Sequence, residues 1–392
     1  MDDKEIFAIN SENDAETGTD DLGLEVPREV IKVVGIGGAG GNALNTIINS
    51  GVTDVDFIAA NTDVAALRLS QAPTRIILGK SLTKGRGAGA DPAKGHDAAQ
   101  ESEEELTQIL SGSDMVFITC GMGGGTGTGA APVIAEIAKE KVNALVVAIV
   151  TFPFMWEGRA RIDRAVEGIE KLREKVDALV IVKNDRIIEL SDKSTSCAEA
   201  FKMSDEVLRQ AVSGVTGVIR KVMTVNVDFA DVCATLHNAG TAIMGVGEAK
   251  GEGRVLAAAR AAMNGPMMTA PMKGATSVLY CIESGEDLNI LEMNEALKLI
   301  HASAAENANI FWGQGIDPAM GDTVRFTLIA TGFKDELEEA EAGRDKSLQG
   351  LDGVFEKQNL TPSDVVSGEN HNIFEGLGAG LDIPTAYRRR KK

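Results

Sequence analysis

The sequence is poor in the residue types that nucleic-acid-binding surfaces need. Aromatic residues make up only 4% of its 392 positions, which argues against a platform on which single-stranded bases stack. The formal net charge is −19, so a surface of clustered positive charge is not expected either. We therefore expect no nucleic-acid partner.

Cysteines are also few, and long apolar runs are missing. The four cysteines show no CxxC pair and no metal-ligand spacing, which is typical of free thiols in a reducing compartment. No apolar run approaches the roughly 18 residues of a membrane-spanning helix. The first 25 residues contain nine acidic residues and one lysine, unlike a secretory signal. We expect a cytoplasmic protein with no integral membrane segment, and we assign no metal-ligating residues.

Glycine, in contrast, is abundant and occurs in runs. The densest run, GMGGGTGTGAAP at 121–132, lies between a β-branched strand pattern and a helical pattern in which Pro132 is expected near the first turn. Ordering glycine costs more conformational entropy than ordering other residues, so such a run indicates close approach or unusual backbone angles. Unpaired N–H groups beside a helix start suit a phosphate chain. A flexible linker is the alternative, but linkers rarely separate two apolar elements.

Two further glycine runs follow other predicted strands. In GIGGAGGN, residues Gly35, Gly37 and Gly40 match the GxGxxG spacing of dinucleotide-binding folds, and Asp63 is a candidate ribose-binding acid. A dinucleotide enzyme needs one such loop, whereas two loops in one sheet suit a nucleotide held from two sides. KGRGAGADP, which starts at Lys84, is a third candidate phosphate contact or a mobile surface turn. Neither GxxxxGKS nor GxxxxGKT occurs, so a P-loop is not expected.

Apolar strand patterns alternate with helical patterns, which predicts an α/β fold with a parallel sheet covered on both faces. The strands predicted for this sheet are 31–37, 56–63, 74–79, 115–121, 144–152 and 177–185. The segments predicted along the chain are a disordered acidic tail (1–27), a nucleotide-binding domain (28–197), a long central helix (198–225), a smaller α/β second domain (226–333), a disordered linker (334–372) and an apolar and basic terminal peptide (373–392).

Two acids in NVDFADV are candidates for chemistry. Asp228 and Asp231 are three residues apart near the end of the predicted long helix, so a helical turn would place both carboxylates on one side. Such a pair can orient and deprotonate water or bind a metal. Two acids at this spacing also commonly form a solvated face, and the apolar neighbours argue against that interpretation.

Polar residues also follow the last two predicted strands of the sheet, where ligands bind in parallel sheets. Glu157 and Arg161 are candidate ligand contacts or a surface ion pair. Asn184 and Asp185 could contact the edge of a purine or cap a turn. The sequence leaves both alternatives open for each pair.

Several of these motifs, in this order, resemble the tubulin/FtsZ family of GTPases and its bacterial cell-division members. The resemblance covers about residues 30–332 and rests on GIGGAGGN, NTD, GAGADP, GGGTGTGAAP, FPFMWEG and NVDFADV. LDIPTAYRRR resembles the family's C-terminal partner-binding peptide. The resemblance implies a GTP-binding domain, a central helix and a smaller activating domain, with GTP or GDP and Mg²⁺ as cofactors.

The resemblance also implies site residues. Those implied to bind the nucleotide are Gly38, Ala39, Gly40, Gly41, Asn42, Asn61, Gly123, Gly124, Gly125, Thr126, Gly127 and Thr128 near the phosphates, Glu157 and Arg161 near the ribose and phosphate, and Asn184, Phe201 and Asp205 at the guanine. Those implied to be catalytic, acting on the neighbouring subunit's γ-phosphate, are Asn226, Asp228 and Asp231. Supplying the acids from another subunit would delay their repulsion of the triphosphate until assembly.

The function implied is that of a self-assembling GTPase that polymerises head to tail and forms the division ring at mid-cell. The peptide Leu381–Lys392 would bind membrane-tethering and regulatory division proteins. Two alternatives stay open. One is a Rossmann-type oxidoreductase, and the other is a scaffold that binds GTP and polymerises without hydrolysing it.

Overall fold

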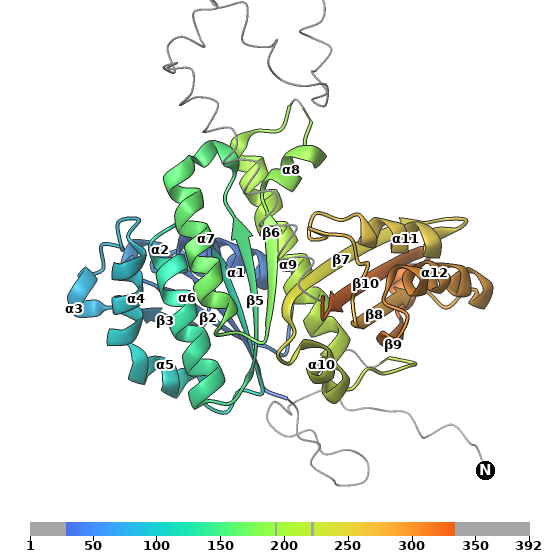
Figure 1. Cartoon of the computed structure of the whole chain (residues 1–392), viewed down its shortest axis with the longest axis horizontal. Coiled ribbons are helices and arrows are strands. Elements are labelled where there is room, and N and C mark those ends of the chain that lie inside the picture. The colour runs from blue at the N-terminus through green and yellow to red at the C-terminus, as the bar shows by residue number, and fades with distance from the viewer. Residues whose placement is uncertain (1–28, 193, 221–222, 334–392) are drawn as a thin grey trace, which may run out of the picture. The chain divides into compact units, whose positions relative to one another are not determined.

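The computed structural model describes residues 29–192, 194–220 and 223–333 (Figure 1). The predicted tail, linker and terminal peptide lie outside these described residues. Within them, ten strands form one sheet in the order β3-β2-β1-β4-β5-β6-β7-β10-β8-β9.

The six strands of the N-terminal half are parallel, and each lies inside a strand predicted from the sequence. Their bounds are β1 Ile31–Ile36, β2 Asp56–Asn61, β3 Thr74–Ile77, β4 Met115–Gly121, β5 Leu145–Phe152 and β6 Ala178–Lys183. Because every pair is parallel, the carboxyl ends of all six strands lie along one edge of the sheet. We call this edge the carboxyl edge and the opposite one the amino edge.

Helices cover both faces of this parallel sheet, as the near-continuous apolar strands predicted. One face packs against α1 (Gly37–Asn49), α2 (Val64–Arg68), α9 (Cys197–Arg220) and α10 (Phe229–Leu236). The other face packs against α4 (Pro92–Glu101), α5 (Glu103–Leu110), α6 (Thr126–Glu136), the π-helical turn η1 (Ile137–Lys141) and α7 (Arg159–Arg173). The short helices α3 (Lys80–Thr83), η2 (Met155–Glu157) and α8 (Asp185–Leu190) follow β3, β5 and β6. Successive strand residues enter opposite cores, as period-two alternation requires: Val33 packs on one side and Val34 on the other.

The second half adds four strands and a third core beneath its own helices. Its elements are β7 Gly240–Lys250, α11 Arg254–Met263, β8 Ser277–Ser284, α12 Ile290–Ser303, β9 Asn309–Ile316, the 3₁₀ turn η3 Pro318–Met320 and β10 Thr323–Thr331. β7 joins the halves because it pairs in parallel with β6 and antiparallel with β10. The α/β architecture, with a long central helix and a smaller α/β part after it, is confirmed.

α9 is the predicted central helix, and it is 24 residues long. Its buried side recurs every three or four residues, through Leu208, Ala211, Val212 and Val215. Among the described residues, none of the helices combines the length and the apolar character needed to cross a bilayer.

Candidate functional site

Two helices begin at the carboxyl ends of the neighbouring strands β1 and β4. α1 starts at Gly37, directly after β1, and α6 starts at Thr126 after a short loop. The first turn of a helix leaves N–H groups without intrahelical partners and carries the positive end of the helix dipole. Neither helix has an acidic residue in its first turn. Together the two helix starts provide anion-binding groups on one edge.

Two glycines of the densest run, Gly127 and Gly129, lie inside α6, whereas the run was predicted to lie between the strand and the helix. Pro132, expected in the first turn, lies in the interior of the helix. The reason is close packing: a Cβ on Gly129 would lie 2.0 Å from the carbonyl oxygen of Pro92 in α4. A Cβ on Gly127 would lie 2.7 Å from the carbonyl oxygen of Gly121. These glycines let α6 approach its neighbours.

Other glycines of the two runs have empty space where a Cβ would lie. An added Cβ on Gly38, Gly41 or Gly124 would meet no heavy atom within 4 Å. Gly123 has a φ of +88°, and a Cβ there would lie 2.5 Å from the carbonyl oxygen of Arg161. The runs therefore combine glycines required by packing with glycines whose bare backbone a ligand can approach.

Hydrogen bonds fix the loop before α6. The Gly123 N–H donates to Thr128 Oγ1 at 2.8 Å, and Arg164 Nε donates to the Gly123 carbonyl oxygen at 3.0 Å. The hydroxyl oxygens of Thr62 and Thr126 are 2.6 Å apart, which links the end of β2 to the start of α6. Neither Thr62 nor Arg164 was named as a candidate site residue, because each makes its contact with a segment far away in the sequence.

The end of β2 contributes a buried amide and a capping acid. Asn61 is 5% exposed, and its Oδ1 accepts a hydrogen bond from Asp63 N at 3.2 Å. The Asp63 carboxylate accepts from Ala65 N at 2.8 Å, so it caps the N-terminus of α2. The acid that a dinucleotide fold would use to bind ribose therefore caps a helix in this structure.

Glu157 and Arg161 form the ion pair that the sequence left as one alternative. Arg161 Nη1 lies 3.0 Å from Glu157 Oε2, and Glu157 Oε1 accepts from Phe154 N at 2.8 Å. The Glu157 side chain is only 7% exposed, whereas that of Arg161 is 45% exposed. The pair lies next to Gly123, so it borders the loop before α6 as well as forming a surface contact.

Residues from β6 and α9 meet at the far end of the same edge. Ser204 Oγ donates to Oδ1 of the buried Asn184 at 2.8 Å. Asp205 follows Ser204 on α9, and burial raises the pKa of its carboxyl to about 7. Asp185 links the segments that follow β5 and β6, because its Oδ1 accepts from Met155 N at 3.2 Å. The structure thus places Asn184 and the α9 residues together.

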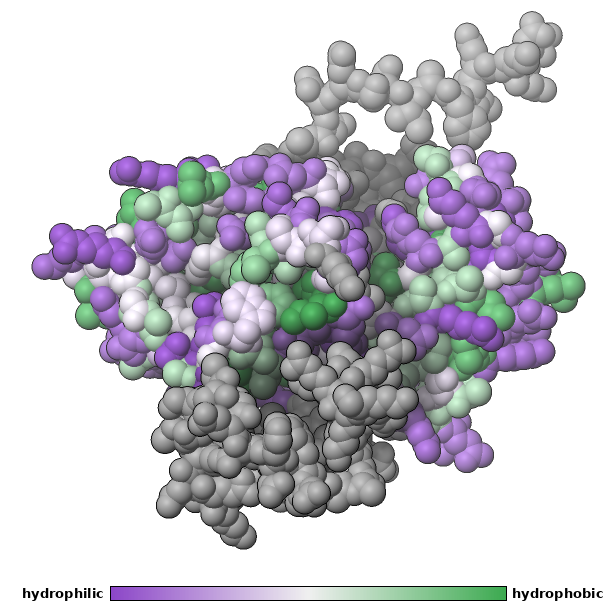
Figure 2. Space-filling view, turned by 90° about the horizontal axis from the view of Figure 1, so that it is seen from above, coloured by the Kyte–Doolittle hydropathy of each residue, from purple (hydrophilic) through white to green (hydrophobic). Residues whose placement is uncertain are grey.

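An exposed aromatic group lies beside these polar residues. Phe201 is 42% exposed, and its ring contacts Phe154 and Trp156 edge-on, with centroid distances of 5.5 Å and 6.1 Å. Met155, Trp156 and Ile188 are also exposed large hydrophobic residues after β5 and β6. Figure 2 looks onto the molecule from above, and it shows an apolar patch near the middle of a mostly hydrophilic face. A flat apolar ring of a ligand can stack on such side chains.

Asp228 and Asp231 follow the long helix, as predicted, but they lie at the start of a separate helix that was not predicted. α9 ends at Arg220, and the two acids begin a separate helix, α10. Asp228 is its N-cap and accepts from Asp231 N at 2.8 Å. Before it, Asn226 Oδ1 accepts from Met223 N at 2.7 Å. Their spacing of three residues is therefore that of a helix cap and its first turn.

These three residues lie at the amino edge, away from the glycine runs. α10 leads into β7, whose Gly240 pairs with Ala178 at the start of β6. In Figure 1, α10 lies at the bottom of the parallel sheet, and α8, which follows the carboxyl end of β6, lies at the top. β5 has eight residues, so it spans about 26 Å between the two edges. The structure brings the nucleotide candidates together and leaves the catalytic candidates apart from them.

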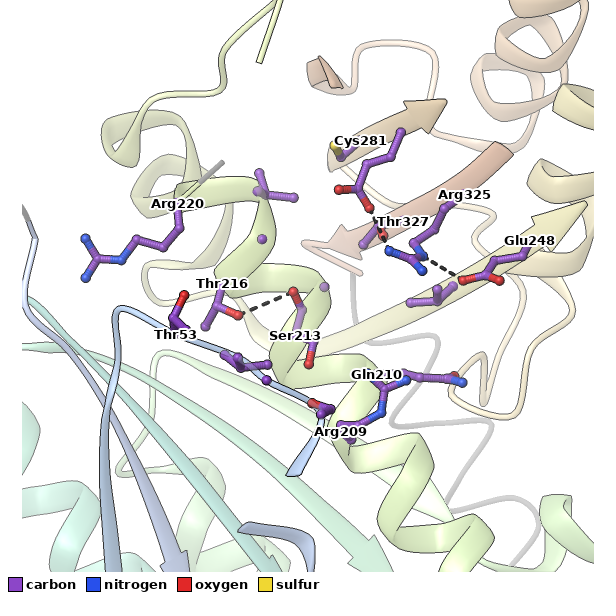
Figure 3. Close-up of a pocket in the computed structure, with 18 of the residues that line it drawn as sticks. Thr53, Arg209, Gln210, Ser213, Thr216, Arg220, Glu248, Cys281, Arg325 and Thr327 are labelled. Atoms are coloured by element: carbon purple, nitrogen blue, oxygen red, sulfur yellow. Dashed lines mark hydrogen bonds and ion pairs between the residues drawn. The ribbon is translucent and has the colours of Figure 1, made fainter. Parts of the chain in front are cut away.

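A cavity of about 760 Å³ occupies a third place, between α9 and the strands of the second half (Figure 3). Arg325 lies on its wall, with Nε 2.6 Å from Glu248 Oε1 and Nη1 3.2 Å from Glu283 Oε2. Arg209 and Ser213 of α9 line the side formed by that helix. None of the candidate site residues lines this cavity. In the described part of the chain, no three His, Cys, Asp or Glu residues are grouped to hold a metal ion.

The fold and the paired helix N-termini at the carboxyl edge define a nucleotide-binding protein of the tubulin-like class. Comparison with known proteins agrees. Residues 30–192 match the tubulin/FtsZ family, GTPase domain, and residues 240–334 match the FtsZ family, C-terminal domain. The empty FtsZ dimer of M. jannaschii is 43% identical, with a TM-score of 0.73 over 78% of this chain and 89% of that chain.

Two more distant solved structures show the same fold. CetZ2 from Haloferax volcanii, a GTPγS-bound protofilament, is 20% identical, with a TM-score of 0.70 over 82% of this chain and 99% of that chain. CetZ1 from the same organism, a GDP-bound monomer, is 23% identical, with a TM-score of 0.68 over 78% of this chain and 95% of that chain.

The chain belongs to the tubulin/FtsZ family, as an FtsZ-type member. It is a GTPase and a GTP-dependent, filament-forming protein of the cell-division cytoskeleton. These matches lend no support to the Rossmann-type oxidoreductase.

Proposed function

We propose that each active site is completed by two subunits, so that hydrolysis of GTP to GDP and phosphate depends on head-to-tail assembly. The observation that supports this most is the separation of the two groups of residues. The candidate phosphate contacts lie at the carboxyl edge, and Asn226, Asp228 and Asp231 lie at the amino edge. Acids at the amino edge can reach a nucleotide only if it belongs to another subunit stacked beneath them.

In this proposal the carboxyl edge binds GTP. The phosphates lie against the starts of α1 and α6, where the open glycines allow close approach. The phosphate residues are Gly38 to Asn42 and Gly123 to Thr128, with Asn61 beside them. Glu157 and Arg161 border the ribose, and Phe201 stacks on guanine while Asn184 and Asp205 contact its polar edge. The donor N–H₂ of Asn184 and the acceptor carboxylate of Asp205 match the O6 acceptor and the N1–H and N2–H donors of guanine.

Mg²⁺ fits this site as a companion of the nucleotide rather than as an ion held by the protein alone. Mg²⁺ usually keeps several waters and is held by substrate phosphates with one or two protein ligands. The described residues agree, since they contain no cluster of three metal-ligating side chains. When bound with GTP, the ion would neutralise phosphate charge, and we assign no protein ligand to it.

At the amino edge, Asp231 orients the attacking water. One oxygen of Asp228 is engaged in capping α10, whereas Asp231 lies in the first turn of that helix. A carboxylate beside the neighbour's γ-phosphate can accept a hydrogen bond from water and take its proton. Asn226 lies in the loop before α10 and belongs to the same surface, which meets the neighbouring subunit.

Replacing Asp231 by alanine tests this assignment. Losing a group that orients water or accepts its proton slows hydrolysis by roughly 10²–10⁴-fold, while GDP affinity stays normal. Asp317→Ala is a matched control, because Asp317 caps the 3₁₀ turn η3 through Ala319 N at 2.9 Å without contacting α10. Weak GDP binding together with normal turnover per bound nucleotide in Asp231→Ala would contradict the assignment.

The cellular role follows from assembly. Filaments of this chain form the division ring at mid-cell in the cytoplasm, and the peptide Leu381–Lys392 attaches them to membrane-tethering and regulatory proteins. The peptide combines apolar residues with five cations at 388–392, which suits a groove with an acidic rim.

A further inference from the structure

A buried carboxylate at the amino edge joins three elements. Asp177, directly before β6, is 1% exposed, and its Oδ2 accepts from Val146 N in β5 at 2.9 Å. Its Oδ1 lies 3.0 Å from Nζ of Lys139 in η1 and 3.2 Å from Nδ1 of His237. Oδ1 also accepts from Asn238 N at 3.3 Å. A buried carboxylate is retained at low cost only when it is paired in this way.

The residues around Asp177 hold the turn that follows α10. His237 Nε2 lies 3.0 Å from Asn238 Nδ2, which can only donate, so Nδ1 carries the proton that is donated to Asp177. Lys139 Nζ donates to Asn238 Oδ1 at 3.1 Å and to the Val176 carbonyl oxygen at 3.2 Å. Asn238 has a φ of +49°, a conformation that asparagine adopts more readily than most residues. Both ring nitrogens of His237, and the backbone N–H and side chain of Asn238, therefore have polar partners.

This cluster is the attachment of α10 to the N-terminal sheet. α10 ends at Leu236, one residue before His237, and its eight residues span about 12 Å. Asp231 lies in the first turn at the other end. On the side of the second half, Thr331 Oγ1 donates to the Thr235 carbonyl oxygen at 2.9 Å. A small rotation of the turn at 237–240 therefore displaces the acids at the start of the helix.

We propose that Asp177 is a positioning residue for GTP hydrolysis, which holds α10 so that its acids meet the nucleotide of the next subunit. The proposal rests on the two-subunit site described above. Asp177 lies at the amino edge and does not touch the nucleotide of its own subunit. It acts through Asp231, and misplacing a catalytic group by about 1 Å can cost about 100-fold in rate.

Asp177→Asn tests the proposal. If the amide oxygen accepts from Val146 N, the amide nitrogen faces the donors of Lys139, His237 and Asn238, so the variant loses these contacts as well as the charge. We expect the turnover number to fall about tenfold or more, with unchanged GDP affinity and normal filament yield, and a lower thermal unfolding temperature because buried donors lose their acceptor. His237→Ala, at an exposed side chain, removes one contact and should lower turnover less. Turnover at the wild-type level in both variants, or a loss matched by an equal loss of GDP affinity, overturns the proposal.

Glu136→Gln is the control at the same edge. Its carboxylate lies 2.6 Å from Lys175 Nζ and joins α6 to the segment before β6 without involving α10. This variant should keep wild-type turnover. If it slows hydrolysis as much as Asp177→Asn does, then the loss of any ion pair at this edge slows hydrolysis. In that case the specific role proposed for Asp177 is wrong.

A mixing experiment separates a role in the neighbour from a role in the same subunit. Gly124→Ser should be weak in nucleotide binding but keep an intact α10, and Asp177→Asn should have the opposite defect. A mixture should hydrolyse GTP faster than the sum of the two variants alone, because an intact α10 then meets an intact nucleotide site. The same mixture with Asp231→Ala tests the two-subunit site. If hydrolysis rises in the mixture with Asp231→Ala but not in the mixture with Asp177→Asn, only the inference about Asp177 is wrong. If hydrolysis rises in neither mixture, the shared site is wrong.

Discussion

Glycine 124 shows how one residue can separate the packing of a glycine run from its function. Its neighbours Gly123 and Gly125 are required by the fold, since a Cβ on either would lie within 3 Å of other atoms. Gly124 has no such restriction. The sequence could not distinguish these glycines, because the atoms that surround them belong to α7 and to Ala88 and Asp91 before α4.

Gly124→Ser should weaken nucleotide binding without unfolding the protein. The added hydroxymethyl group enters open space in the folded chain, but that space is where the phosphates are proposed to lie. GDP affinity should fall in a titration that follows the fluorescence of Trp156, while the thermal unfolding temperature stays near that of wild type. Gly217→Ser in α9, which also adds a side chain to open space, is the control. Unchanged GDP affinity in Gly124→Ser would contradict the phosphate position.

Asp205 should give the proposed nucleotide site a pH dependence. Burial raises the pKa of its carboxyl to about 7 from an ordinary value of 3.8, so near neutral pH it is partly protonated. In the proposed site, guanine N–H groups donate to the carboxylate and lower its pKa, so binding should release a proton. GDP affinity should therefore fall as the pH drops below about 7, by up to about tenfold per pH unit. A titration from about pH 8 to about pH 6 checks this.

Asp205→Asn is the control for that titration, and it should remove the slope. A slope that persists in the variant would assign the proton to another group. The same pKa has an opposite sign for stability in the absence of nucleotide. The folded chain binds the proton more tightly than the unfolded chain, so this group's contribution to stability decreases as the pH rises from about 4 to about 7.

At the scale of elements, the sequence predicted what near-continuous apolar strands and helical periodicity can reveal. All six parallel strands were predicted, because strands buried on both faces consist almost wholly of apolar residues. β7 was missed. Its Gly245 and Gly247 look unlike a strand, but a Cβ on them would lie 2.0 Å and 2.2 Å from carbonyl oxygens of α11. The glycines are there because a helix crosses the strand at very close range, which is a long-range cause.

The candidate site residues also fall into two groups, those that a local sequence pattern indicates and those that distant contacts hold in place. Asn184 was predictable because it follows a strand and parallel strands end at one edge, whereas Asn61 was named only through the resemblance. α10 was not predicted as a separate helix, since the loop at 223–228 before it is held by contacts such as that of Val225 with Gln314, far away in the sequence. The cluster around Asp177 has no local pattern at all.

Gly245→Ala should destabilise the fold. The methyl group cannot be accommodated unless α11 moves away from β7, and overpacking of this kind typically costs about 1–3 kcal/mol. Equilibrium unfolding in denaturant should show a lower midpoint with an unchanged slope. Gly217→Ala, in open space on α9, should leave the midpoint equal or slightly higher. Equal midpoints for wild type and Gly245→Ala would show that β7 and α11 are not packed as described.

At the scale of the whole molecule, the candidate nucleotide contacts and the candidate catalytic acids lie on opposite edges of one sheet. In the proposed mechanism, the helix starts attract the triphosphate, and the acids that would repel it meet it only when a second subunit arrives. This arrangement would couple hydrolysis to assembly. This coupling could be anticipated from the sequence only through the resemblance, since no local pattern places α10 at the amino edge.

The terminal peptide should be separable from the GTPase. Deleting Leu381–Lys392 removes apolar and cationic residues that lie outside the matched domains at 30–192 and 240–334. Turnover and filament formation should stay at the wild-type level in solution, while the protein disperses from the division site in cells. Loss of GTPase activity would place the peptide in the catalytic part, and normal localisation without full-length subunits would show that it is not the anchor.

The most direct test of the shared site is GTP turnover per subunit measured against protein concentration. If each site needs two subunits, specific activity should be close to zero at high dilution and rise steeply once filaments form. Light scattering recorded on the same samples should rise over the same concentrations. A specific activity that stays constant down to dilutions without filaments would show that a single subunit hydrolyses GTP, and would contradict this account.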